Sequence, residues 1–234
     1  RLAKTTKPID LFSHAAVATA PFVLPRLPVR VNRYWTFQPS LGQVSTSPVV
    51  AFQLYALPFY ADFRRLFLLV NAGADQDLPE NASDEIRAVG LSQFIKEIRT
   101  RLSSGGGSVH KISQALEQSA LLKSDVRRYR ALKSYIELYY GENYRYLNFY
   151  GPPRTIQTVP FHRALLSDRD NSGTRIDFKD KVVFVGLSET LLTEHEDSFH
   201  TVFSDEKGTF ISGVEVLATA FANLLENSSI TPLQ

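Results

Sequence analysis

Apolar positions repeat with a helical period in four parts of the chain. Between 47 and 57 a Ser-Pro pair precedes an almost continuous apolar run, which predicts a buried helix with serine at its N-cap and proline in its first turn. Apolar residues recur every three or four positions over 83–102 and again over about 112–140, which predicts amphipathic helices. The apolar-rich segment 213–226 predicts the last helix.

Other apolar runs are short and rich in β-branched and aromatic residues, which is typical of strands. Segments 21–25, 28–37 and 146–150 predict strands. The run Lys181 to Val185 predicts a central strand that is buried on both faces. We therefore expect an α/β fold with a mixed central sheet flanked by helices, in one domain over 1–234 that carries a helical insertion over 75–142.

Composition narrows the classes of protein to which the chain can belong. Its 234 residues are 44% hydrophobic, which is enough to fill a core, and the net charge of +2 argues against nucleic acid as a partner. Cysteine is absent, which removes disulfides and thiolate ligands for zinc. The sequence contains no run of 18 apolar residues, so it predicts no membrane span.

Charge is unevenly distributed, because the predicted insertion is basic. Between 96 and 145 there are ten lysines and arginines but only five acidic residues. One interpretation is a solvated helix face, and the other is a docking surface for anionic lipid headgroups or a partner subunit.

The motifs of common enzymes are incomplete. Gly186 ends the apolar run as in a nucleotide-binding fold, but the further glycines of a dinucleotide fingerprint are missing, and no phosphate-binding loop is present. The sequence around Ser188 does not fit a nucleophile elbow. We therefore expect neither enzymatic activity nor a cofactor.

An acidic loop over 193–200 holds the densest set of metal-capable side chains. His195 and His200, together with a carboxylate such as Asp197, could bind a divalent ion. The two histidines are five positions apart and do not share one helical face, so we expect a polar loop in which Asp197 makes a structural hydrogen bond.

Polar residues that flank a Gly-Pro-Pro turn at 151–153, follow the apolar run or open the last helix are candidates for ligand binding. Arg154 could hold an anion, or it could tie the turn to an acid such as Asp177. Glu215 lies in the first turn of the last helix, where the helix dipole favours a carboxylate. The candidate ligand-binding residues are Asn148, Arg154, Ser188, Glu189, Asp197 and Glu215.

Three motifs, in this order and spacing, resemble a known family. They are Asn-Phe-Tyr-Gly-Pro-Pro at 148–153, Val-Val-Phe-Val-Gly-Leu-Ser at 182–188 and Ser-Gly-Val-Glu-Val-Leu-Ala at 212–218. Together they are similar to the second type of CHASE domain, the cyclase/histidine-kinase-associated sensing extracellular domain. The family's histidine after its Val-Glu pair is Leu217 here, which weakens the case for ligand binding in the family's manner at this helix start.

The resemblance implies an extracytoplasmic sensory domain of a bacterial receptor. Such a domain passes conformational change through flanking transmembrane helices to a cytoplasmic cyclase, kinase or similar output domain. It implies a periplasmic location in an inner-membrane protein, an unknown small molecule or envelope signal as ligand, and a homodimer. The family's opening strand is not seen ahead of Arg1, so we expect a fragment that lacks it. The alternative is a non-sensing envelope interaction module that uses an aromatic and basic surface over 129–144.

Overall fold

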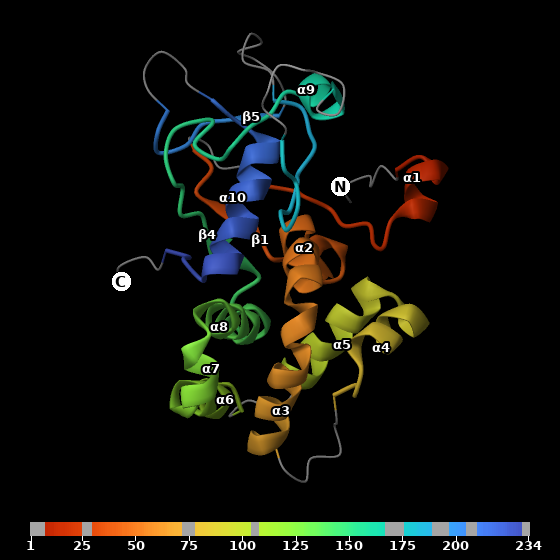
Figure 1. Cartoon of the computed structure of the whole chain (residues 1–234), viewed down its shortest axis with the longest axis vertical. Coiled ribbons are helices and arrows are strands. Elements are labelled where there is room, and N and C mark those ends of the chain that lie inside the picture. Colours follow the sequence, from red (N-terminus) through yellow and green to blue (C-terminus); the bar gives the residue numbers. More distant parts are fainter. Residues whose placement is uncertain are drawn as a thin grey trace. The chain divides into compact units, whose positions relative to one another are not determined.

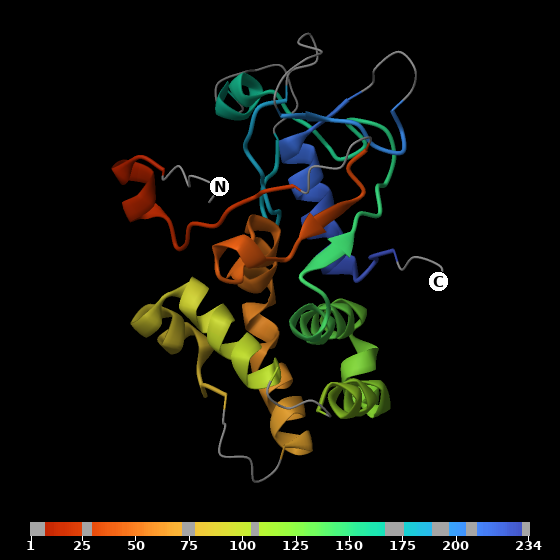
Figure 2. The same cartoon turned by 180° about the vertical axis from the view of Figure 1, so that it is seen from behind.

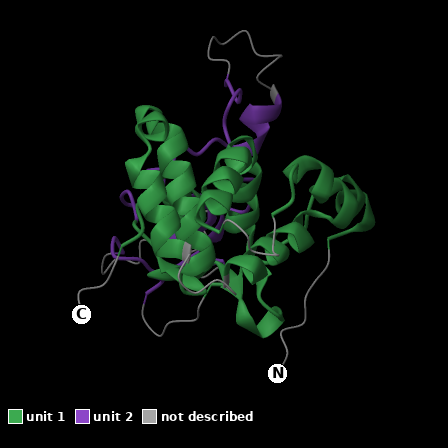
Figure 3. Ribbon diagram, turned by 90° about the horizontal axis from the view of Figure 1, so that it is seen from below, with its two compact units in different colours: residues 1–26, 32–148, 220–234 green, residues 27–31, 149–219 purple. Residues whose placement is uncertain are grey.

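The computed structural model describes the chain over residues 8–24, 30–71, 78–103, 108–166, 176–188, 197–204 and 210–230. The chain divides into two compact units, which Figure 3 draws in different colours. The first unit comprises residues 1–26, 32–148 and 220–234, and the second comprises 27–31 and 149–219. The single domain over 1–234 and the insertion over 75–142 stay predictions.

The elements of the first unit are mainly helices (Figures 1 and 2). In chain order they are α1 (Asp10–Ala15), β1 (Arg33–Trp35), β2 (Phe37–Gln38), the 3-10 turn η1 (Pro39–Leu41), β3 (Val44–Ser45), α2 (Ser47–Ala56), the 3-10 turn η2 (Leu57–Phe59), α3 (Tyr60–Val70), α4 (Ala82–Val89), α5 (Leu91–Ser103), α6 (Ser108–Gln118), α7 (Ala120–Ser124), α8 (Val126–Tyr140) and β4 (Tyr144–Tyr146). The second unit contains α9 (Phe161–Leu166), β5 (Ser198–Phe199) and β6 (Ile211–Ser212). The last helix, α10 (Gly213–Glu226), begins in the second unit and ends in the first.

Helix α2 begins one residue earlier than the Ser-Pro pair predicts. Thr46 is the N-cap, in an extended conformation, and Ser47 is the first helical residue. Ser47 anchors an earlier segment instead: its Oγ donates to the carbonyl of Ala20 at 2.9 Å, and its N–H donates to that of Pro21 at 2.9 Å. The helix is buried over most of its length, as predicted.

The stretch predicted as one amphipathic helix over 83–102 forms two helices. Gly90 separates α4 from α5 with a φ of 85°, a conformation that side chains disfavour. Asn81 caps α4 in place of Ser83, because its Oδ1 accepts the N–H groups of Ser83 at 2.9 Å and of Asp84 at 3.4 Å. The apolar stripe of α5 lies inside the unit, and its buried members are Leu91, Phe94, Ile95, Ile98 and Leu102.

A glutamine lies between two tyrosines in the helical core. The amide Nε2 of Gln53 donates to the hydroxyl of Tyr135, and the hydroxyl of Tyr139 donates to Gln53 Oε1 at 2.9 Å. The ring of Phe63 packs against Tyr135 with 4.4 Å between centroids. Burial raises the pKa of both tyrosines, so their hydroxyls stay neutral. These bonds satisfy groups that would be costly to bury unpaired.

The aromatic surface predicted over 129–144 is therefore wrong in part. Tyr135 and Tyr139 are four positions apart, which places both on the inward face of α8, and they belong to the core. Tyr129 donates its hydroxyl to Glu117, and Tyr144 packs edge-on against Trp35 with 6.2 Å between centroids.

The described strands form three antiparallel pairs, each of two strands. β1 pairs with β4, β2 with β3, and β5 with β6. The molecule thus mixes helices and strands as predicted, but the central sheet is not found among the described residues. Residues 181–185, which we predicted as the central strand, form no strand. A strand needs neighbours with which to form hydrogen bonds, and β5 and β6, the strands in the described parts of the second unit, pair with each other.

The second unit also exposes residues that we predicted to be buried on both faces. Val183 is 52% exposed and Val185 is 76% exposed. An apolar run cannot by itself distinguish a doubly buried strand from an uncovered extended segment. Within the described ranges, no helix combines the length and apolar character that crossing a bilayer requires.

Candidate functional site

Helix α10 carries three buried polar side chains on one face. Glu215, Thr219 and Asn223 follow one another at intervals of four residues in an otherwise apolar helix. Thr219 satisfies its own hydroxyl by donating to the carbonyl of Glu215 at 2.8 Å. The other two side chains bind segments that lie far away in the sequence.

Glu215 binds the backbone of the Gly-Pro-Pro-Arg turn. Its Oε1 accepts the N–H of Arg154 at 2.6 Å, and the backbone N–H of Ile156 also favours the charged carboxylate. Burial raises the pKa of Glu215, while the two N–H groups and the charge of Arg154 oppose that rise. Arg154 adopts a φ of 71°, so this bond holds a residue in a conformation that non-glycine residues rarely adopt.

The carboxylate of Asp197 lies against the first residue of the same helix. The N–H of Gly213 donates to the backbone carbonyl of Asp197 at 3.0 Å. A Cβ on Gly213 would collide with all three atoms of the Asp197 carboxylate group, so any other residue here would force the Asp197 side chain to move. A carboxylate beside a helix N-terminus is favoured by the helix dipole.

Gly186 packs on the next residue of α10. A Cβ built on Gly186 would lie 2.7 Å from the Cβ of Val214, which is closer than side chains tolerate. The motif at 182–188 therefore contacts the motif at 212–218 through Gly186 and Val214. Ser188 follows two residues later and is half-buried.

Asn148 makes its contact within the first unit. Its N–H donates to Oδ1 of Asn223 at 2.8 Å, and its carbonyl accepts from Nδ2 of Asn223 at 2.9 Å. The amide of Asn223 thus replaces a neighbouring strand, because it satisfies both backbone groups of one extended residue.

The structure brings some of the predicted residues together and separates others. Arg154, Asp197 and Glu215 meet at the first turn of α10 in the second unit, whereas Asn148 lies in the first unit. Glu189 and His195 lie outside the described residues. The involvement of any of these residues in ligand binding stays a prediction.

His200 has a packing contact in place of a polar one. Its ring lies against Phe210 with 4.4 Å between centroids, and its carbonyl accepts the N–H of Val31 at 2.8 Å. Among the residues that the structure describes, no three metal-capable side chains gather in one place. The Asp177 carboxylate accepts the N–H of Lys179 at 2.9 Å, and its predicted tie to Arg154 stays a prediction.

The sequence analysis did not identify Asn223 or Thr219, and it did not predict the close contact between Gly213 and Asp197. The signal was present, since polar residues at 215, 219 and 223 share one face of a helix that is otherwise buried and apolar. The chemical role of this arrangement is to bind backbone groups. Glu215 and Asn223 reach from α10 and form hydrogen bonds with main-chain groups of distant segments. This is the chemistry of a scaffold whose parts hold one another in register.

No curated protein and no solved structure matches the chain. The CHASE2 domain matches residues 41–234, which is most of the chain and includes all three motifs. The chain therefore belongs to the CHASE2 family, a family of extracytoplasmic sensor domains without catalytic function.

Proposed function

We propose that the chain is the extracytoplasmic sensory domain of a bacterial transmembrane receptor. It responds to a small molecule or envelope signal, and flanking transmembrane helices carry the response to a cytoplasmic cyclase, kinase or similar output domain. The observation that carries this proposal is the CHASE2 match over 41–234. The convergence of the family motifs on the first turn of α10 supports it.

The signal acts by shifting an equilibrium between two arrangements of the domain or of its homodimer. A ligand can shift such an equilibrium only if its affinity for the two arrangements differs. Helix α10 is suited to carry the shift, because its first seven residues belong to the second unit and its last seven to the first. A change at Glu215 therefore reaches Asn223 through one continuous helix.

A location assay tests the membrane part of the proposal. The 234 residues contain no cysteine, so a single introduced cysteine gives a clean signal. Arg87 is suitable because its side chain is 81% exposed. In intact cells that express the full-length parent polypeptide, Arg87→Cys is expected to react with a membrane-impermeant maleimide, while the unsubstituted parent is the control. Labelling only after lysis would overturn the extracytoplasmic location.

A signalling assay tests the proposed ligand residues. Arg154 contributes its backbone N–H to Glu215, so Arg154→Ala keeps that bond and is expected to fold normally but to lose its response. The measurements are the melting temperature of the chain and the output of the parent receptor. A lowered melting temperature together with an intact response would contradict the role in sensing.

An envelope interaction module is the second candidate function. It is favoured by exposed apolar side chains on α9 in the second unit, namely Phe161 and Leu165. In this case Leu165→Asp would abolish association with one defined envelope protein, and no metal, anion or metabolite would raise the melting temperature. Reproducible stabilisation by a small molecule would favour the sensor instead.

A further inference from the structure

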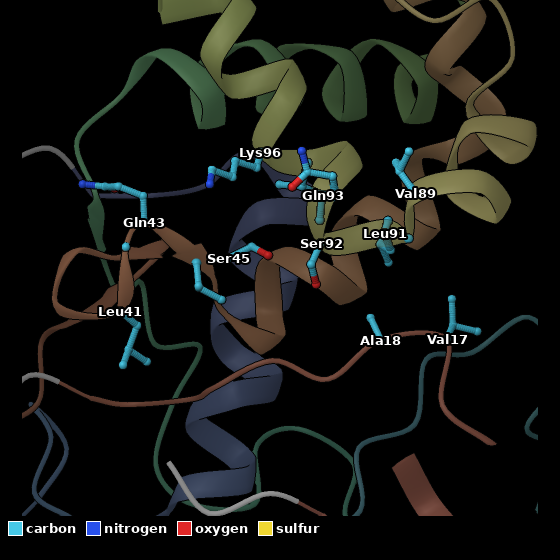
Figure 4. Close-up of a pocket in the computed structure, with 14 residues that line it drawn as sticks. Val17, Ala18, Leu41, Gln43, Ser45, Val89, Leu91, Ser92, Gln93 and Lys96 are labelled. Carbon is cyan, nitrogen blue, oxygen red and sulfur yellow. The ribbon is translucent and has the colours of Figure 1, made fainter. Parts of the chain in front are cut away.

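The first unit contains a cavity of about 540 Å³ beside the β2–β3 hairpin. Strand β3 and the end of η1 form one wall, the junction of α4 and α5 forms another, and residues 17–18 of the extended segment after α1 close a third side (Figure 4). A volume of this size is within the usual range for small-molecule sites, roughly 300–1,000 Å³. The described residues that line the cavity all belong to the first unit.

A serine with no partner points into this cavity. Ser45 is only 4% exposed, yet its hydroxyl makes no hydrogen bond with any residue that the structure describes. Its backbone is fixed by pairing with Phe37 in the hairpin. The neighbouring Thr46, by contrast, donates its hydroxyl to the carbonyl of Trp35 at 2.6 Å. The Oγ of Ser45 is not one of the fully buried polar atoms that lack a partner, so the hydroxyl is open to the cavity and can bind a group that enters it.

The start of α5 supplies further donors on the opposite side. The first helical hydrogen bond runs from the N–H of Phe94 to the carbonyl of Gly90 at 3.0 Å, which leaves the N–H groups of the first three helical residues without a helical partner. Ser92 is one of these residues, and its hydroxyl and that of Ser45 lie on facing sides of the cavity (Figure 4). Such a helix start favours an anion.

Lys96 adds a positive charge at the same place. It lines the cavity one turn further along α5 and extends toward the side of Gln43 (Figure 4). Its ammonium group makes no ion pair with the described residues. None of the described residues that line the cavity is an aspartate or glutamate, so Lys96 carries the formal charge of this part of the lining.

The rest of the lining is mixed, because Gln43 and Gln93 contribute amide groups beside the aliphatic residues. Val17, Leu41 and Val89 contribute aliphatic side chains, and Ala18 lies on the wall formed by the extended segment. A ligand that matches this lining has one negatively charged end and one short apolar end. One full positive charge and a partial helix charge match a monoanion better than a dianion.

We propose that this cavity binds a small monocarboxylate with an aliphatic tail. Its carboxylate accepts hydrogen bonds from Ser45, Ser92 and the start of α5 and is paired with Lys96, while its tail lies against Val17 and Val89. The claim that this carboxylate is the signal of the sensor rests on the proposed function. The claim that the cavity binds it does not, because binding can be measured on the 234-residue chain.

Calorimetric titration with n-octanoate tests the proposal. We expect saturable binding of octanoate and none of 1-octanol, which has the same tail without the charge. Lys96→Gln is expected to weaken binding about tenfold, the effect of one charge-assisted contact. Lys111→Gln removes an equally exposed lysine on α6, outside the cavity, and is the matched control with unchanged affinity.

Two further variants separate binding from folding. Ser45→Ala removes a hydroxyl that has no partner, so it should leave the melting temperature unchanged and weaken octanoate binding severalfold. Ala18→Leu places a larger side chain in the cavity from a half-buried position and should abolish binding. Circular dichroism of each variant checks the fold.

Several results would overturn the inference. These are no binding of octanoate, equal binding of octanoate and octanol, tighter binding of octyl phosphate than of octanoate, or undiminished binding by folded Lys96→Gln and Ala18→Leu. Failure here leaves the maleimide assay on the parent polypeptide untouched, so the sensor proposal can stand without this ligand. Conversely, octanoate binding by a chain that proves to be cytoplasmic would keep the site and reject the sensor.

Discussion

The first unit buries most of its large apolar side chains, although it exposes others such as Phe12 and Leu69, whereas the second unit buries few of its own. In the first unit, α2, α3, α5 and α8 enclose aromatic and aliphatic side chains that are almost fully buried. In the second unit the exposed apolar residues include Phe161, Leu165, Val182, Val183, Val185, Leu187, Val202 and Phe203.

The two units are therefore stabilised in different ways. Burial of apolar area stabilises the first unit, at roughly 25 cal/mol per Å². In the described part of the second unit, order comes instead from close glycine contacts and from carboxylates that bind backbone N–H groups. Large apolar substitutions should thus matter most in the first unit, and small polar or glycine substitutions should matter most in the second.

The largest effect is expected from truncation of a core ring in the first unit. Phe63→Ala removes a fully buried ring that packs against Tyr135 and should lower the free energy of unfolding by about 3–5 kcal/mol. Val185→Ala in the second unit is the matched control, and its exposed side chain should change stability by no more than about 0.5 kcal/mol. Urea unfolding measures both, and similar losses would end the contrast between the units.

The next effect concerns polar groups in the same core. Gln53→Leu keeps the volume but leaves the hydroxyls of Tyr135 and Tyr139 without their amide partner, at a cost of about 2–4 kcal/mol. The same substitution in a Tyr135→Phe, Tyr139→Phe background should cost much less. An equal cost in both backgrounds would mean that the amide does not act through these hydroxyls.

A smaller loss is expected from a single methyl group in the second unit. Gly213→Ala drives a Cβ into the Asp197 carboxylate and should destabilise by about 1–3 kcal/mol. Asp197→Ala removes every atom that collides, so the double variant should recover most of the loss. If the double variant is no more stable than Gly213→Ala, the close contact is not the cause.

The smallest effect is the pH dependence contributed by Glu215. Its pKa is raised in the folded state, so the folded chain holds this proton more tightly than the unfolded chain does. The contribution to stability is present below the ordinary value of 4.5 and is lost as the pH rises through the raised pKa. Glu215→Gln should lack this loss and still accept the N–H of Arg154. Urea unfolding of both proteins from pH 4 to 7 measures it, and parallel curves would contradict it.

Helices were predictable from sequence because their signals are local. The Ser-Pro start of α2, the stripe that includes Phe94 and Ile98, and the glycine that opens α10 all act within a few residues. The exact caps were not predictable, since Asn81 and Thr46 compete with equally suitable neighbours.

Whether 181–185 form a strand, and which site residues contact one another, depends on distant parts of the chain. A run of valines predicts a strand only if other strands flank it, and periodicity carries no information on that. Arg154 and Glu215 were each identified as candidates, but their contact uses a backbone N–H, which no side-chain pattern reveals. The cavity at Ser45 was not anticipated, because a lone serine in a short hairpin has no distinctive spacing.

The spacing of Glu215 and Asn223 along α10 limits which insertions and deletions this helix can tolerate. One residue inserted after Thr219 would rotate everything beyond it by about 100°, so Asn223 would leave the face that it shares with Glu215. Only additions of three or four residues, close to a full turn, would restore the phase. Indels of one or two codons in this helix should therefore be selected against, even where every encoded side chain is a good helix former.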